Sequence, residues 1–184
     1  MKGESKCALN PIFGRWRSQL LYARAAVGLA VMLLALLSGG ADAQNAARIA
    51  RGRYLVKLGG CNDCHTDGFT ESNAKVPERD WLEGSALGWH GPWGTTYPVN
   101  LRLLIGGISE GQWLEYLRTM QPKPPMPWWA LRWMTPQDQR AVYVYIRHLG
   151  PTGKKAPADL PPGVSPLPPF VSFPMPPALA KTAR

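Results

Sequence analysis

Apolar residues recur at helical spacing in three stretches of the chain, each bounded by residues that start or stop helices. The first predicted helix follows residue 44, ends at Gly59-Gly60 and carries the apolar positions Ala47, Ala50, Tyr54 and Leu58. Gly52 lies inside it, where glycine costs about 1 kcal/mol relative to alanine. Either this glycine is merely tolerated or it lets another helix approach closely, and we expect the close approach.

Two further helices have clear start signals. Ser109 and Gln112 form a capping-box pair ahead of an amphipathic run, and Thr135-Pro136 combines an N-cap with proline at the first helical position. The run after Ser109 should face the cofactor proposed below, and the last helix should dock on the core and stop at Gly150-Pro151. The apolar positions of the two helices are Trp113, Leu114, Leu117 and Met120, then Val142, Tyr145, Ile146 and Leu149.

Between the helices the pattern predicts loops. Residues 66–98 are rich in Gly and Trp without periodicity and should form a loop. Tyr97 should be extended because a proline follows it, and Asn100 can fix a turn through its own backbone. Four prolines between Gln121 and Trp129 exclude a helix there. The ten prolines after residue 150 predict extended chain, either a linker or a strap laid over the domain. We expect a strap, anchored by the apolar residues Leu167, Phe170, Val171 and Phe173.

The N-terminal composition predicts export. Five basic residues precede an apolar run over residues 25–37, and Ala41-Asp42-Ala43 then predicts signal cleavage before Gln44. The alternative is an uncleaved anchor with membrane association, although the run is short for a span of about 20 residues. The chain thus divides into a signal (1–43), one domain with a single core (44–150) and a proline-rich tail (151–184).

Charge suggests the kind of partner. Removing residues 1–43 takes away five basic and two acidic residues, so the net charge falls from +9 to +6. A moderately basic surface favours an acidic protein partner through steering of encounter, while nucleic acid is excluded because no basic run is present.

The most specific motif is Cys61-Asn62-Asp63-Cys64-His65. CxxCH is the attachment signature of a c-type haem: two thiols form thioethers and the histidine binds iron. A zinc site would need a second ligand pair, and Cys7, the one other cysteine, lies in the export segment. A thioredoxin-like pair would need a βαβ context, which the pattern lacks. One covalent haem is therefore predicted, with His65 as the proximal ligand.

The second axial position has several candidates. Methionine raises the reduction potential, a second histidine usually lowers it, and an open site admits external ligands. The candidates are Met120, Met126, Met134, Met175, His90 and His148. Met126 lies in the proline-rich loop, which can hold a side chain rigidly, and His90 is the alternative. The indole N–H groups of Trp81, Trp89 and Trp93 need acceptors, which a haem propionate can supply.

CNDCH after a short helix, Met126-Pro127 in a proline-rich loop and a tyrosine-bearing last helix together resemble a class I cytochrome c. The resemblance covers about residues 46–150 and implies the all-α cytochrome c fold, with short helices and long loops around one covalent haem. It also implies Met126 as the distal ligand, because it stands nine residues before Thr135. Asn100 and Arg102 are candidates for the haem edge or propionates.

Residues Gly94 to Leu101, with Gly106-Gly107-Ile108 and Trp113, are further similar to cytochrome subunits of periplasmic dehydrogenases. Val99 interrupts their Pro-Asn pair, and this chain has a single CxxCH where those subunits often carry several. The resemblance predicts a periplasmic electron carrier rather than an enzyme. Two alternatives stay open: a haem enzyme or ligand sensor with a displaceable sixth ligand, and a subunit of a larger dehydrogenase or oxidase with the tail as docking element.

Overall fold

The computed structural model describes residues 42–174. Residues 46–174 belong to one compact unit. Residues 1–41, which are nearly all of the predicted export segment, lie outside the described residues, and so does Met175, one of the distal-ligand candidates. No helix within residues 42–174 is long and apolar enough to cross a membrane.

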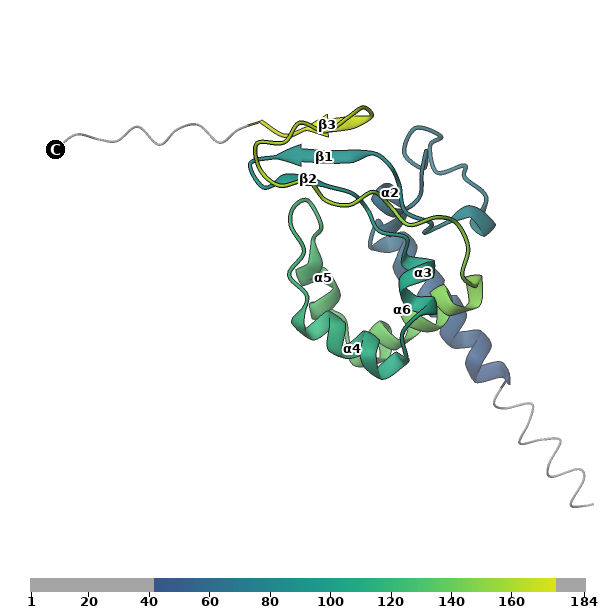
Figure 1. Cartoon of the computed structure of the whole chain (residues 1–184). Helices are drawn as coiled ribbons and strands as arrows, with labels where there is room; N and C mark the ends of the chain where they lie inside the picture. Colours follow the sequence, from purple (N-terminus) through teal and green to yellow (C-terminus); the bar gives the residue numbers. More distant parts are fainter. Residues whose placement is uncertain (1–41, 175–184) are drawn as a thin grey trace, which may run out of the picture. The chain divides into compact units, whose positions relative to one another are not determined.

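Helices make up most of the regular structure, as predicted, and one small sheet joins them (Figure 1). In chain order the elements are a first helix described over residues 42–58, α2 (Cys61–His65), a 3₁₀ turn (Glu78–Asp80), β1 (Gly88–Gly91), β2 (Gly94–Thr96), α3 (Leu101–Gly106), α4 (Glu110–Thr119), α5 (Trp128–Trp133), α6 (Pro136–Leu149) and β3 (Phe170–Ser172).

The first helix packs against α6 at Gly52. A Cβ atom placed on Gly52 would lie 2.0 Å from the carbonyl oxygen of Ala141 and 2.6 Å from Cβ of Tyr145. No real side chain fits at these distances, so the close approach of two helices at this glycine is confirmed.

The apolar stripe predicted for the first helix was wrong. Its four positions are exposed in the structure, Leu58 to 69%. The buried face instead carries Gly52, Leu55 and Val56, with Ile49 packed at its edge. The close contact at Gly52 decides which face of the helix is buried. The apolar pattern could not identify this face, because glycine has no side chain and was not counted as an apolar position.

The caps of α4 and α6 are confirmed. The Ser109 hydroxyl accepts from the Gln112 amide while the Gln112 side chain accepts from the Ser109 amide. The Thr135 hydroxyl accepts from the Asp138 amide, and Pro136 opens α6. Both predicted apolar faces are buried or packed on the core, so these two helices follow from sequence alone.

Two short helices were not predicted. The predicted turn at Asn100 is present, because its side chain accepts from the Leu103 amide at 3.0 Å, but it opens the helix α3. The loop predicted to reach Trp129 ends at Pro127, and Trp128 and Trp129 belong to α5. The prolines exclude helix only up to Pro127; after the last proline, nothing prevents a helical turn.

The stretch 66–98, predicted to be all loop, contains two strands. β1 and β2 form an antiparallel hairpin in which Trp89 lies opposite Thr96. β3, from the C-terminal tail, adds to the other edge of β1 in parallel, giving the order β2-β1-β3 (Figure 1). Strands this short leave no periodic pattern, and their third member comes from about 80 residues further along the chain.

The tail crosses the domain as a strap, here defined as residues 151–174. The amide and carbonyl of Thr95 exchange hydrogen bonds with those of Leu160, at 3.0 and 2.9 Å. The ring of Phe173 packs on Trp89 and Trp93, with centroids 6.0 and 5.3 Å apart. The prediction of a strap is therefore confirmed, but three of its four predicted anchors are exposed, Leu167 to 84%, Phe170 to 38% and Val171 to 40%, and only Phe173 is partly buried.

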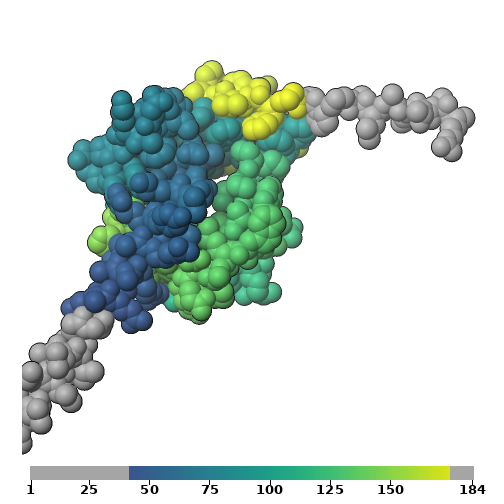
Figure 2. Space-filling model, turned by 180° about the vertical axis from the view of Figure 1, so that it is seen from behind, coloured from purple at the N-terminus to yellow at the C-terminus, as the bar shows by residue number. Residues whose placement is uncertain are grey.

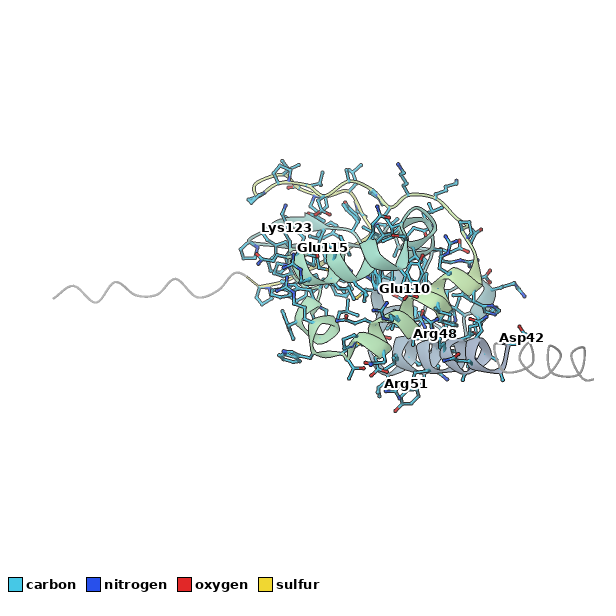
Figure 3. All side chains as sticks on the ribbon, turned by 90° about the horizontal axis from the view of Figure 1, so that it is seen from below. Asp42, Arg48, Arg51, Glu110, Glu115 and Lys123 are labelled. Atoms are coloured by element: carbon cyan, nitrogen blue, oxygen red, sulfur yellow. The ribbon has the colours of Figure 1, made fainter. Side chains whose placement is uncertain are left out.

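Ion pairs join the first helix to the rest of the unit. Arg48 contacts Glu110 at 2.8 Å, Arg51 contacts Asp138 at 2.8 Å, and Arg53 contacts Glu78 at 2.6 Å. Figure 3 shows Arg48 and Glu110 together, with Arg51 further along the same helix. Three of the arginines that contribute to the net charge are thus paired with carboxylates.

Candidate functional site

The CNDCH motif forms one short helix immediately after a chain reversal. The first helix ends at Leu58, and Gly60 adopts a left-handed conformation with φ of 63° at the N-cap of α2. A side chain at Gly60 would also meet the Asp63 carboxylate at 2.8 Å. Glycine therefore lets the chain turn sharply, so that Cys61, Cys64 and His65 are presented by a single helical segment.

His65 is held in the form that binds a metal ion. Its side chain is buried, and Nδ1 lies 2.7 Å from the carbonyl oxygen of Val99. A carbonyl only accepts, so Nδ1 carries the proton and Nε2 keeps a free lone pair. Burial lowers the pKa of His65, which favours the neutral imidazole. Such a second contact fixes the ring of a metal-binding histidine and selects Nε2 as its ligand atom.

The two thiols of the motif are unpaired. Burial raises the pKa of Cys61 to about 11 and also raises the pKa of Cys64. A redox-active thiol has a lowered pKa, so these two cysteines lack the property of a catalytic dithiol. Two thiols three residues apart on one helical turn, beside a neutral imidazole, suit covalent attachment of a porphyrin edge.

Two buried donors have no hydrogen-bond partner among the described residues: Nδ2 of Asn62 and Nε1 of Trp89. The other two tryptophans of this region are satisfied, since Trp81 donates to the Val76 carbonyl and Trp93 to the Trp89 carbonyl. Buried donors normally find acceptors. An indole N–H left free in this way fits the predicted haem, whose propionates are acceptors.

The other predicted haem-edge residues, Asn100 and Arg102, are buried and bind protein oxygens. The Asn100 amide donates to the carbonyls of Thr152 and Lys154 in the strap. All three guanidinium nitrogens of Arg102 donate to protein oxygens, those of Arg79, Glu83, Leu149 and Gly150. These contacts give both residues a part in the fold, and their contact with a haem stays a prediction.

The candidates for the distal ligand occupy different surroundings. Met120 and Met134 pack against the hydrophobic core, and His148 is exposed. Met126 lies in the loop between α4 and α5, half-buried and not among the residues that pack on the core. His90 lies in β1 with its Nδ1 2.8 Å from the Thr95 hydroxyl.

Figure 2 shows a small gap in the surface where blue residues and green residues meet. Met126 belongs to the green segment and His65 to the blue one. The sequence assigns the two proposed ligands to these segments, but it does not give the distance between them.

Val99 has a role that its residue type does not reveal. Val99 counted only as an interruption of a Pro-Asn pair, whereas its carbonyl orients His65. Any residue supplies a carbonyl, so no residue type marks this function. Only the register of residues 97–101 against α2 would have revealed it.

A comparison with protein families gives one match. The family model described as Cytochrome c matches residues 49–150, a span that includes α2, the Met126 loop and all of α6. Searches among curated proteins and among solved structures found no match. The matched span is more than half of the chain.

Proposed function

Because the chain belongs to the cytochrome c family, we propose that it is an exported electron carrier that holds one haem through Cys61, Cys64 and His65 and moves single electrons between redox partners. When bound, the haem supplies one-electron chemistry at its iron. The observation that carries the proposal is the bond between Nδ1 of His65 and the Val99 carbonyl, because it leaves Nε2 free as a ligand.

Met126 is proposed as the distal ligand. The two other methionines among the described residues, Met120 and Met134, have side chains that pack on the hydrophobic core. Met126 stands apart from that core, in a loop whose prolines restrict its motion. A thioether at the sixth position stabilises the reduced state and raises the potential, which suits an electron carrier.

The spectrum of the haem-loaded protein tests this assignment. Met126→Leu removes the sulfur and nearly preserves volume, and Met134→Leu makes the same change at a core position. We expect the first variant to lose the weak near-infrared sulfur-to-iron band and to lower the reduction potential, while the control keeps both. A band that persists in Met126→Leu contradicts the assignment. A wild-type spectrum that is low-spin but lacks the band, and that becomes high-spin in His90→Asn, would transfer the role to His90.

The same preparation tests the class of function. A six-coordinate, low-spin spectrum in both oxidation states supports electron transfer. Rapid binding of carbon monoxide to the reduced wild-type protein, with the fold retained, would instead support a haem enzyme or ligand sensor with a displaceable ligand.

The periplasm is the proposed location, and an acidic redox protein is the proposed partner. The net charge of +6 expected after signal cleavage supports a partner with a negatively charged docking surface, because opposite charges steer the encounter of two proteins. Arg48, Arg51 and Arg53 are paired with carboxylates, so the steering field comes from other cations. Association should slow as ionic strength rises, because exposed charges are screened beyond about 10 Å at 0.1 M salt.

A second candidate function is that of a cytochrome subunit in a larger oxidoreductase. It is favoured by the apolar side chains that the strap exposes, at 44, 84, 38 and 40% of their surfaces: Val164, Leu167, Phe170 and Val171. Exposed apolar residues grouped on one segment often mark a protein interface. The test is copurification from the native membrane or periplasm: Leu167→Ser should release a genuine partner while leaving the spectrum unchanged.

A further inference from the structure

The loop that carries Met126, residues 120–127, has few contacts of its own. Four of its eight residues are prolines, which have no N–H to donate. Among the described residues, the amides of residues 121–127 donate no hydrogen bond to another backbone group. The conformation of such a loop depends on its prolines and on contacts made from outside it.

One outside contact comes from the sheet. Thr96, the last residue of β2, donates a hydrogen bond from its hydroxyl to the carbonyl of Pro124 at 2.9 Å. Pro124 lies two residues before Met126. The contact ties the middle of the loop to the hairpin that the strap covers.

The other outside contact comes from Arg132 in α5. Its Nε donates to the Leu117 carbonyl at 3.1 Å and one terminal nitrogen donates to the Met120 carbonyl at 2.5 Å. Both carbonyls belong to the C-terminal end of α4, where helical carbonyls lack partners. Arg132 therefore holds the point at which the loop leaves α4.

Arg132 also holds the point at which the loop enters α5. Its guanidinium carbon lies 4.3 Å from the centroid of the Trp128 ring, a cation–π contact. The Trp128 amide in turn donates to the Met126 carbonyl at 2.9 Å. The Arg132 side chain thus contacts both ends of the loop, and Trp128 links it to the backbone of Met126.

We propose that Thr96 and Arg132 are positioning residues that hold the thioether of Met126 in place as the sixth ligand and so set how readily an external ligand displaces it. This inference rests on the proposed role of Met126. Neither residue touches the haem in this proposal. Capping of α4 by Arg132 is the plain structural role, and it would affect stability alone.

Imidazole provides the probe, because it competes with a thioether for the sixth position and its binding changes the optical spectrum. The variants are Thr96→Val, Arg132→Gln and Arg132→Lys, measured as haem-loaded protein. The controls are Thr119→Val and Arg118→Gln on α4. The first loses a hydroxyl bond to the Glu115 carbonyl and the second an ion pair with Glu115, and neither side chain makes a hydrogen bond to the loop. Imidazole affinity, reduction potential and denaturant unfolding are measured for each.

We expect Thr96→Val to raise imidazole affinity about fivefold, the usual effect of one lost hydrogen bond on an equilibrium constant, and Arg132→Gln about tenfold or more. Arg132→Lys should give an intermediate value, because lysine keeps the charge and loses the planar fork. The controls should bind imidazole as the wild type does. Gly52→Ala, which acts where the first helix packs on α6, should lower the free energy of unfolding without raising imidazole affinity.

The outcomes separate the two levels of inference. If Met126→Leu loses the sulfur band but the Thr96 and Arg132 variants bind imidazole with wild-type affinity, the positioning role is overturned and the proposed function stands. If Met126→Leu keeps the band, both the ligand assignment and the positioning role fall. Should Arg132→Gln not fold, Thr96→Val decides alone, since its side chain lies at the end of a strand and outside the core.

Discussion

Replacing Gly52 by alanine should destabilise the protein, although alanine is the better helix former. On propensity alone the change stabilises a helix by about 1 kcal/mol. In the structure the new Cβ would lie 2.0 Å from the Ala141 carbonyl oxygen, where ordinary contact begins at 3.4 Å. The obstacle is backbone, so it cannot rotate away, and the first helix must move off α6.

The cost follows from what lies at this crossing. Leu55, Val56, Tyr145 and Ile146 are each at most 6% exposed and form part of the same core. Forcing extra atoms into a packed core costs typically about 1–3 kcal/mol. Because the backbone carbonyl leaves no room to repack, the upper half of that range applies, and the net loss should be about 1–2 kcal/mol after the gain in propensity.

Gly111 provides the matched control. It is also helical, in α4, and nothing lies within 4 Å of a Cβ placed there. Gly111→Ala should therefore stabilise the protein by about 0.5–1 kcal/mol. Denaturant unfolding of the haem-loaded variants, followed by circular dichroism, measures both. If Gly52→Ala were as stable as Gly111→Ala, the close packing inferred at the helix crossing would be refuted.

Three further predictions address charge, the haem edge and the strap. Hydrogen bonds from Arg53 and from the Tyr145 hydroxyl hold the pKa of Glu78 below its ordinary value of 4.5. The stability that the Glu78 carboxylate contributes is therefore present above pH 4.5 and is lost as pH falls through the lower folded pKa. Glu78→Gln should be less stable than the wild type at pH 7, and denaturant titrations should show this difference shrinking in acid; a difference that does not change with pH would contradict the linkage. Trp89→Phe removes the unpaired indole N–H and should lower the reduction potential by about 20–60 mV, the equivalent of about one hydrogen bond, while Trp93→Phe, whose N–H binds a protein carbonyl, should leave the potential unchanged in spectroelectrochemical titration. A chain ended at residue 150 loses the strap and its bonds to Thr95 and Asn100 and should unfold at clearly lower denaturant concentration than a chain ended at residue 174; equal midpoints would mean that the strap contributes nothing to the fold.

Local chemistry made several parts of this protein predictable. The CNDCH motif specifies its cofactor because thioether attachment needs two thiols and an adjacent imidazole on one turn. The capping box at Ser109 and the Thr135-Pro136 start signal specify α4 and α6, since each satisfies free amides at a helix end with neighbouring residues. These signals lie within a few residues of the structure that they determine.

Other parts depend on residues that meet only in the folded chain. The buried face of the first helix is set by Gly52, whose lack of a side chain matters only where α6 crosses it. β3 pairs with β1 from the far end of the sequence, and three-residue strands carry too few side chains to reveal a period. Such pairings are fixed by register across the fold, which no local pattern encodes.

The same division runs through the site. The sequence determined which residues are proposed to carry the haem chemistry, because Cys61, Cys64 and His65 are recognisable by their motif and Met126 by its place before the last helix. The tertiary structure decided what orients them: the Val99 carbonyl on His65 and the contacts of Thr96 and Arg132 on the loop that carries Met126. Orientation here is carried out by backbone carbonyls, which every residue has, so only the folded chain shows which of them are used.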